Sequence, residues 1–533
     1  NRGGHDPHKV YAAFHAAVNH RDQPTVILAH TIKGYGMGGS GEAMNIAHQA
    51  KKMSDDDIRA FRDRFDIPVP DDQLAQLPYV KFPEGSKELE YMRSRRMELG
   101  GYLPQRRSKA ESLEVPKLDT FAPLLEATSE GREISTTMAF VRLLNIVIKD
   151  KVLGKRVVPI VPDESRTFGM EGMFRQLGIW SQVGQLYTPQ DHDQLMFYKE
   201  DKHGQILQEG INEAGAMCDW IAAATSYSTH GVPMLPFYIF YSMFGFQRIG
   251  DLAWAAGDMR SRGFLLGGTA GRTTLNGEGL QHEDGHSHLW SGAVPNCISY
   301  DPCFAFELAV IIQDGMRRMM TDQEDVYYYI TLMNENYAHP AMPKGSEQDI
   351  LKGMYRLTSV GDSKAKQRVQ LLGSGTIFRE VIAAADMLRD DWGVASDIWG
   401  CPSFTELARD WNAVNRHNLL HPTDKPVLSH VEKMLVSQVG PVVAATDYVR
   451  LFAEQIRPAI HNLGKRYTVL GTDGFGRSDT RERLRHFFEV DRRWVTVAAL
   501  KTLADEGQIK HQVVADAMKK YGLDPNKPNP MTV

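Results

Sequence analysis

The feature that most constrains this chain is a recurring pattern of short apolar runs, rich in β-branched and aromatic residues, separated by stretches of helical character. Parallel strands need long crossover connections, which are usually helices, so this spacing predicts parallel sheets with helices packed on them. The fold class that we expect is therefore α/β. The predicted strands are residues 25–29, 157–161, 234–239, 264–267, 326–332, 369–372, 441–445 and 467–471.

The length of 533 residues is too great for one hydrophobic core, so we expect several domains. The pattern is interrupted at residues 82–118, which are rich in Pro, Gly and charged residues, as in a linker. A second interruption at residues 336–348 contains Pro340, Pro343 and Gly345. These breaks predict domains at residues 1–110, 111–340 and 341–533.

Charge and hydrophobicity exclude some classes of protein. With 61 basic and 66 acidic residues, the chain has no broad positive charge for a nucleic-acid partner. No run approaches 18 uninterrupted apolar residues, so we expect no membrane partner. The four cysteines are too few and too scattered for a disulfide framework or a four-sulfur metal site, which predicts a reducing, cytoplasmic setting. They are Cys218, Cys297, Cys303 and Cys401.

The amino-terminal residues read as a loop, a helix over residues 9–19 and then a buried strand. That order is typical of the middle of an α/β domain. We therefore expect that the chain is truncated at its amino terminus.

The string HEDGH at residues 282–286 matches the pattern of zinc proteases. That chemistry needs both histidines on one helical face, and the Asp-Gly interior disfavours a helix. We expect no zinc there and predict no metal ligands in this chain, although His282, His286 and His288 could line a polar pocket. Glycines at 373–375 and 471–476 lack phosphate-loop spacing and predict turns.

Two segments carry residues suited to catalysis. Residues 208–217 place Glu209 and Glu213 four apart among small apolar residues, so one carboxylate could point into a cleft. Residues 236–248 are densely aromatic, which in isolation is more typical of core than of a ligand site.

The order and spacing of these segments resemble a known family. A Gly-x-x-Glu step ending at Glu213, followed by the aromatic pair Tyr241 and Phe244, resembles the pyrimidine-domain signature of transketolase-like thiamine diphosphate enzymes. Within that group, the whole chain is similar to the homodimeric bacterial pyruvate dehydrogenases, the decarboxylating first components of pyruvate dehydrogenase complexes. The matching strings are AHTIKGYG at 29–36, NIAHQ at 45–49, TFGMEG at 167–172 and LQHEDGH at 280–286.

The resemblance implies thiamine diphosphate as cofactor, with Glu213 against its aminopyrimidine ring. Tyr241 and Phe244 would lie on or beside that ring, and Ile211 would pack nearby. Glu164, which follows a predicted strand, would line the pocket.

The activity implied is oxidative decarboxylation of pyruvate and reductive acetylation of the lipoyl group of dihydrolipoyl acetyltransferase, which leads to acetyl-CoA. Lys33, His48 and His282 are the implied catalytic residues beside Glu213. Residues 34–41 resemble a mobile loop that closes over substrate, with Glu42 as a further participant.

The family's Gly-Asp-Gly magnesium and diphosphate motif is missing from this sequence, so we expect those ligands outside this chain. The resemblance also implies a homodimer and a lipoyl-domain partner. Three alternatives stay open: a 2-oxoglutarate dehydrogenase component, a transketolase and a non-catalytic scaffold subunit.

Overall fold

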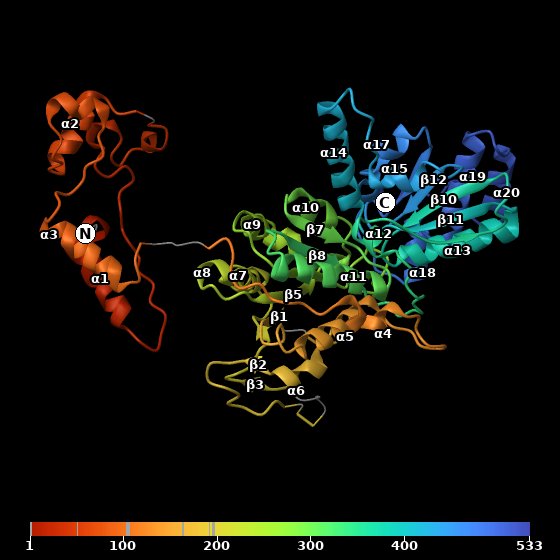
Figure 1. Cartoon of the computed structure of the whole chain (residues 1–533), viewed down its shortest axis with the longest axis horizontal. Coiled ribbons are helices and arrows are strands. Elements are labelled where there is room, and N and C mark those ends of the chain that lie inside the picture. The colour runs from red at the N-terminus through yellow and green to blue at the C-terminus, as the bar shows by residue number, and fades with distance from the viewer. Residues whose placement is uncertain (1–2, 51, 103–106, 163–164, 191, 194–197) are drawn as a thin grey trace. The chain divides into compact units, whose positions relative to one another are not determined.

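The computed structural model describes residues 3–50, 52–102, 107–162, 165–190, 192–193 and 198–533. It divides into two compact units, Asn1–Gln105 and Arg106–Val533 (Figure 1). None of the helices in the described part of the chain combines the length and the apolar character needed to cross a membrane.

The first unit is built from helices joined by turns. Its main helices are α1 (Pro7–Asn19), α2 (Asp55–Arg64) and α3 (Lys87–Glu98), with short 3₁₀ helices between them. Asp6 caps α1 through the amides of His8 and Lys9, and Ser54 forms a capping box with Asp57 at the start of α2. These side chains satisfy amides that have no partner within the helix, which fixes where each helix begins.

The predicted strand at residues 25–29 is wrong. The structure assigns no strand to the described residues of the first unit, and Val26 and Leu28 are exposed. An isolated extended segment gains no ladder hydrogen bonds, so a β-prone sequence does not become a strand without a neighbouring one.

The second unit contains a six-stranded parallel sheet in the order β4-β1-β5-β6-β8-β7. We call this the first sheet. The strand order changes direction at β1, because β4 pairs with one edge of β1 and β5 with the other. The strands are β1 (Val157–Val161), β4 (Leu207–Gln208), β5 (Leu235–Tyr241), β6 (Phe264–Gly268), β7 (Cys297–Tyr300) and β8 (Tyr327–Thr331).

Helices cover both faces of the first sheet. Alternate residues of β5 point to opposite faces, so Phe237 and Ile239 join one apolar cluster and Tyr238 and Phe240 another. The first cluster packs on α5 (Thr136–Ile148) and α11 (Ala305–Met316), and the second on α7 (Glu213–Ala224) and α9 (Gly245–Asp258). Burial on both faces explains why these strands read as continuous apolar runs.

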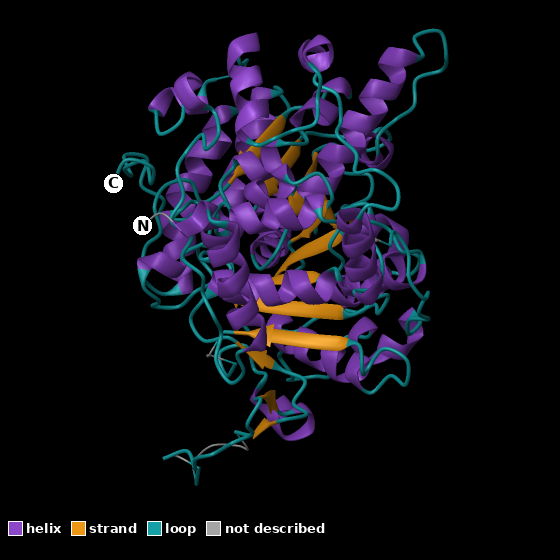
Figure 2. Cartoon of the chain, turned by 90° about the vertical axis from the view of Figure 1, so that its left-hand side faces the viewer, coloured by secondary structure: helices purple, strands orange, loops and turns teal. Residues whose placement is uncertain are grey.

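The second sheet has five strands in the order β13-β12-β10-β11-β9, of which only β9 runs antiparallel to its neighbour. Helices again lie on both sides of it (Figure 2). One face packs on α13 (Ile377–Trp392) and α19 (Arg492–Asp505), and the other on α14 (Phe404–Leu420), α15 (His430–Leu435) and α17 (Arg457–Asn462). The strands are β9 (Tyr355–Val360), β10 (Arg368–Gly373), β11 (Ala395–Gly400), β12 (Val442–Ala445) and β13 (Tyr467–Leu470).

Shorter elements complete the second unit. Strands β2 (Ile179–Trp180) and β3 (Glu200–Asp201) form a small parallel pair. The remaining α-helices of the described residues are α4 (Ala122–Leu125), α6 (Phe174–Leu177), α8 (Ser226–Thr229), α10 (Ser287–Ala293), α12 (Glu347–Leu351), α16 (Leu451–Glu454), α18 (Arg481–Phe487) and α20 (His511–Lys520).

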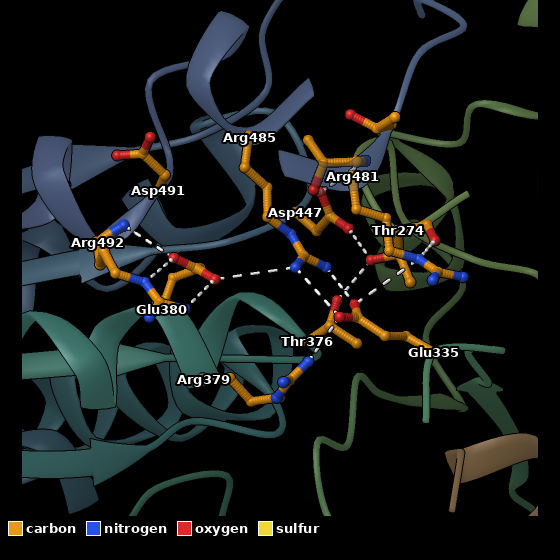
Figure 3. A network of polar contacts seen from close by, with 12 residues as sticks. Thr274, Glu335, Thr376, Arg379, Glu380, Asp447, Arg481, Arg485, Asp491 and Arg492 are labelled. Atoms are coloured by element: carbon orange, nitrogen blue, oxygen red, sulfur yellow. Dashed lines mark hydrogen bonds and ion pairs between the residues drawn. The ribbon is translucent and has the colours of Figure 1, made fainter. Parts of the chain in front are cut away.

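An ionic network joins the segment after β8 to the helices of the second sheet (Figure 3). Glu335 accepts hydrogen bonds from Arg379 of α13, at 2.7 Å, and from Arg485 of α18. Arg485 also lies 3.8 Å from Glu380, which pairs with Arg492 of α19. The network therefore links three helices to the end of the first sheet.

Candidate functional site

A cavity of about 450 Å³ lies at the carboxyl ends of β1 and β5, next to the point where the strand order changes direction. Parallel α/β sheets place ligands at this position, because loops from neighbouring strands diverge there. It is lined by Pro162, Thr167, Ile211, Glu213, Phe240, Tyr241, Phe244, Glu278, Gln281 and His282.

Glu213 is the first residue of α7, and its side chain is only 13% exposed. The preceding residue, Asn212, caps the helix by accepting a hydrogen bond from the amide of Gly215 at 3.1 Å. The Glu213 carboxylate accepts a hydrogen bond from Arg248 at 2.6 Å, and the positive end of the α7 dipole also favours its negative charge. The fold thus holds the Glu213 carboxylate in the cavity wall, paired with a cation.

Three rings form a second wall. Tyr241 ends β5 and Phe244 directly precedes α9, so the turn between strand and helix brings both into the cavity. The ring of His282 lies 5.0 Å from each of these two aromatic rings, measured between centroids. The Arg248 guanidinium covers the Phe244 ring at 4.2 Å. A flat aromatic ligand has stacking partners here.

The HEDGH string does not form a zinc site. His282 ends a short 3₁₀ helix (Leu280–His282), whereas His286 precedes α10, so the two residues do not share a helical face. His288 is buried and interacts with Ser299 and Thr331, and burial lowers the pKa of His288 to about 3. Within the described residues, no three His, Cys, Asp or Glu side chains gather closely enough to hold a metal ion. Of these three histidines, His282 alone lines the cavity.

The structure brings together the described site residues that were predicted in the second unit, and one of them is more exposed than the others. Glu213, Tyr241, Phe244, His282 and Ile211 all line the cavity, but Ile211 is 71% exposed and sits at its edge. Glu164 lies outside the described residues.

Lys33 and His48 belong to the other unit, where both are exposed. The segment between them is folded around Glu42, whose carboxylate accepts hydrogen bonds from the amides of Gly36 and Gly38. Glu42 also pairs with Arg64, which lowers the pKa of Glu42. In this structure the glycine-rich segment is a set of turns closed by one carboxylate.

Sequence reasoning did not single out Thr167, Glu278 and Gln281 as lining residues. Thr167 follows β1, and Glu278 and Gln281 lie within four residues of His282. These three residues could have been predicted from their positions next to segments already assigned to the site.

Comparison with solved structures identifies the class of fold. Transketolase from Campylobacter jejuni superposes with a TM-score of 0.61 at 17% identity, covering 93% of this chain and 66% of that protein. Transketolase from Pichia stipitis superposes with a TM-score of 0.60 at 14% identity, covering 94% of this chain and 66% of that protein. The fold is therefore transketolase-like.

Sequence comparison is more specific. Residues 113–340 match the model of the pyruvate dehydrogenase E1 component middle domain, and residues 353–491 match the transketolase-like C-terminal domain. The pyruvate dehydrogenase E1 component of Cupriavidus necator is 73% identical over 533 residues, 100% of this chain and 59% of that protein. That of Escherichia coli K12 is 59% identical over 532 residues, 99% of this chain and 59% of that protein. The chain belongs to the pyruvate dehydrogenase E1 component family and spans about 59% of the length of these relatives.

Proposed function

We propose that this chain forms part of a thiamine diphosphate-dependent enzyme that decarboxylates pyruvate oxidatively and transfers the resulting acetyl group to a lipoyl group. The observation that carries this proposal is the cavity in which Glu213, Tyr241, Phe244 and His282 meet, within a chain of this family.

The donor set of the cavity fits the pyrimidine end of the cofactor. A carboxylate and two aromatic rings suit a flat heterocycle that carries ring nitrogens and an amino group. Among the described lining residues there is no Lys or Arg for a diphosphate, and the described residues include no group of three His, Cys, Asp or Glu side chains that could hold its metal. We therefore propose that magnesium and the diphosphate are held by residues outside the described part of this chain.

When bound, thiamine diphosphate supplies a carbon nucleophile for the keto carbon of a 2-oxo acid and accepts the electrons released by decarboxylation. Glu213 would hold a proton at a pyrimidine nitrogen, a task that needs a carboxylate shielded from water. Tyr241, Phe244 and Ile211 would bury the ring, which strengthens that hydrogen bond by lowering the local dielectric.

His282 lies beside the same rings and would move a proton at the substrate oxygen. Lys33 and His48 are proposed for the substrate carboxylate and for the transfer to the lipoyl group, as the resemblance implies. Glu164 is proposed as lining.

The domain limits at about 110 and 340, a homodimeric assembly and the lipoyl domain of dihydrolipoyl acetyltransferase as partner belong to the same proposal. A cytoplasmic location is also proposed. It is supported by the four cysteines, which are all free thiols, since oxidising compartments favour disulfides.

The test is Glu213→Gln in the full-length protein, assayed for pyruvate-dependent lipoyl acetylation with added thiamine diphosphate and magnesium. We expect kcat to fall at least about 100-fold, the usual contribution of a positioned proton-transfer group, with the unfolding temperature retained. Asp219→Asn is the matched control, because Asp219 lies on the same helix but does not line the cavity. Wild-type turnover in Glu213→Gln would remove this carboxylate from the mechanism.

A further inference from the structure

Arg272 is a buried residue outside the cavity lining that connects two parts of the chain that are far apart in sequence. It follows β6, is only 4% exposed and does not line the cavity. Its guanidinium donates to the carbonyl groups of Thr472, at 2.6 Å, and Gly474, which follow β13 of the second sheet. In the other direction, its Nε donates to the carbonyl group of Glu283 at 3.4 Å.

Glu283 is the residue next to His282 in the segment that we call the histidine loop, residues 277–286. The planar guanidinium of Arg272 has several donors and reaches three main-chain carbonyl groups on two sides. No other side chain offers this arrangement of donors. Arg272 therefore ties the histidine loop to the end of the second sheet.

The histidine loop packs closely against Arg272 and against the segment that follows β13. A Cβ atom on Gly285 would lie 2.4 Å from the Arg272 guanidinium carbon, and one on Gly476 would lie 2.3 Å from Cβ of Glu283. The loop is also bonded at its ends, since the Gly277 amide donates to Asp479 and the Val449 amide donates to Gly285, at 3.0 and 2.8 Å. His282 is thus carried on a short segment held by the second sheet.

The side chain of Glu283, next to His282, does not itself anchor the histidine loop. Glu283 is 1% exposed, and neither carboxyl oxygen has a hydrogen-bond partner within the described residues. Burial raises the pKa of Glu283 to about 9, so the group is neutral at pH 7. Because the neutral Glu283 side chain has no hydrogen-bond partner within the described residues, the histidine loop is anchored by its main chain, which is bonded to Arg272.

We propose that Arg272 is a positioning residue for His282, so that the second-sheet half of the molecule sets the reactivity of the cavity although it contributes no lining residue. The inference rests on the role proposed above for His282. Small displacements of a proton-transfer group cost rate because the reacting atoms must lie within hydrogen-bond reach.

The experiment uses the full-length enzyme with thiamine diphosphate, magnesium, pyruvate and a lipoyl acceptor. In Arg272→Lys, one ammonium group cannot bond to carbonyls on both sides, and we expect kcat to fall roughly 10- to 100-fold with KM for pyruvate little changed. The pH profile of kcat should change in the same way as in His282→Asn. Gly476→Ala, which pushes on Glu283 from the second-sheet side, should give the same pH signature while leaving Arg272 in place.

Arg409→Lys is the control for loss of a half-buried guanidinium that also bonds to several main-chain carbonyls and pairs with Glu406. Arg409 of α14 also donates to three main-chain carbonyls of the first-sheet half, those of Gly292, Val294 and Cys297, but does not line the cavity. It should lower the unfolding temperature as Arg272→Lys does, while kcat and the pH profile stay at their wild-type values.

A double variant separates the outcomes. Adding Arg272→Lys to His282→Asn should cause no further loss of kcat if Arg272 acts through His282, and a further 10-fold loss would overturn the inference. Full activity of Arg272→Lys beside an impaired His282→Asn also contradicts this inference and leaves the proposed function standing. Full activity of His282→Asn itself contradicts the proposed role of His282.

Discussion

At the scale of single residues, burial decides which of the three neighbouring histidines can take part in chemistry. His282 lines the cavity, whereas His288 is enclosed by the rings of Tyr329, Tyr448 and Phe452. Burial keeps the pKa of His288 near 3, so it is a neutral, hydrogen-bonded core residue. Spacing alone does not distinguish three histidines within seven residues, and only the family resemblance singled out His282 before the fold separated them.

His288 should make stability depend on pH. In the unfolded chain its pKa is near 6.5, and in the folded protein it is about 3, so only the unfolded state takes up a proton between these values. Above pH 6.5, His288 therefore does not lower the free energy of unfolding. As the pH drops from 6.5 toward 3, the free energy of unfolding falls by on the order of 1 kcal/mol per pH unit.

His288→Gln should flatten this slope, because an amide does not titrate. The measurement is thermal unfolding from pH 7 to 4.5, with exposed His203→Gln as control. The difference between wild type and His288→Gln should shrink as the pH falls. A constant difference would show that His288 is not a buried neutral group.

At the scale of elements, seven of the eight strands predicted from apolar runs are confirmed, all of them in the second unit, whereas β2, β3, β4, β7, β9 and β11 were not predicted. Strand β11 was missed because it contains Ser396 and Asp397, which read as loop residues. Asp397 is buried and accepts hydrogen bonds from Arg368 at 2.9 Å and Gln370 at 2.9 Å, partners on the neighbouring strand β10. A buried charge paired across strands cannot be foreseen without the strand order.

The fold class is confirmed, whereas the roles of the site residues stay predictions. Glu213 and Tyr241 were predicted from a family pattern, and in the structure one starts α7 and the other ends β5, so that both line the same cavity. The contacts of Arg272 link residues about 200 positions apart, which no local pattern indicates.

The cap of α7 should affect both stability and activity. Asn212→Ala removes the acceptor for the Gly215 amide, so we expect a loss of about 1 kcal/mol in the free energy of unfolding. Because Glu213 is the next residue, fraying of this turn should also weaken cofactor binding, measured by calorimetric titration of thiamine diphosphate into the full-length protein. Asn212→Asp keeps a capping acceptor and should retain both properties; equal losses in both variants would contradict this account.

At the scale of the whole second unit, the two sheets are joined by apolar and ionic contacts together. One apolar cluster runs from the first sheet to the second, where Phe304 packs against Phe378 at 5.7 Å between centroids. Beside it lies the network centred on Glu335 (Figure 3). We therefore expect the two sheets of this unit to unfold together, since they share this cluster in addition to the apolar cluster that each has on its other face.

Glu335→Gln tests that coupling. Burial alone would raise the pKa of Glu335, but the hydrogen bond and charge of Arg485, with those of Arg379, lower it. A depressed carboxylate pKa gives stability that is present above pH 4.5 and is lost as the pH falls through the lower folded value. Glutamine removes the carboxylate bonded to the buried Arg485, which keeps Glu380 at 3.8 Å, so we expect a loss of about 3 kcal/mol at pH 7, the lower end of the usual cost of breaking a buried pair.

The measurement is unfolding in urea at pH 7, followed by circular dichroism and by tryptophan fluorescence. The two probes should shift together in Glu335→Gln, because the network spans both sheets. Asp390→Asn, which removes the exposed pair with Arg389, should leave the unfolding midpoint close to that of the wild type. Two separate transitions in the Glu335→Gln protein, with the second sheet still folded after the first has unfolded, would contradict this expectation. They would mean that the sheets are coupled by the ionic network and that the apolar cluster alone is not enough.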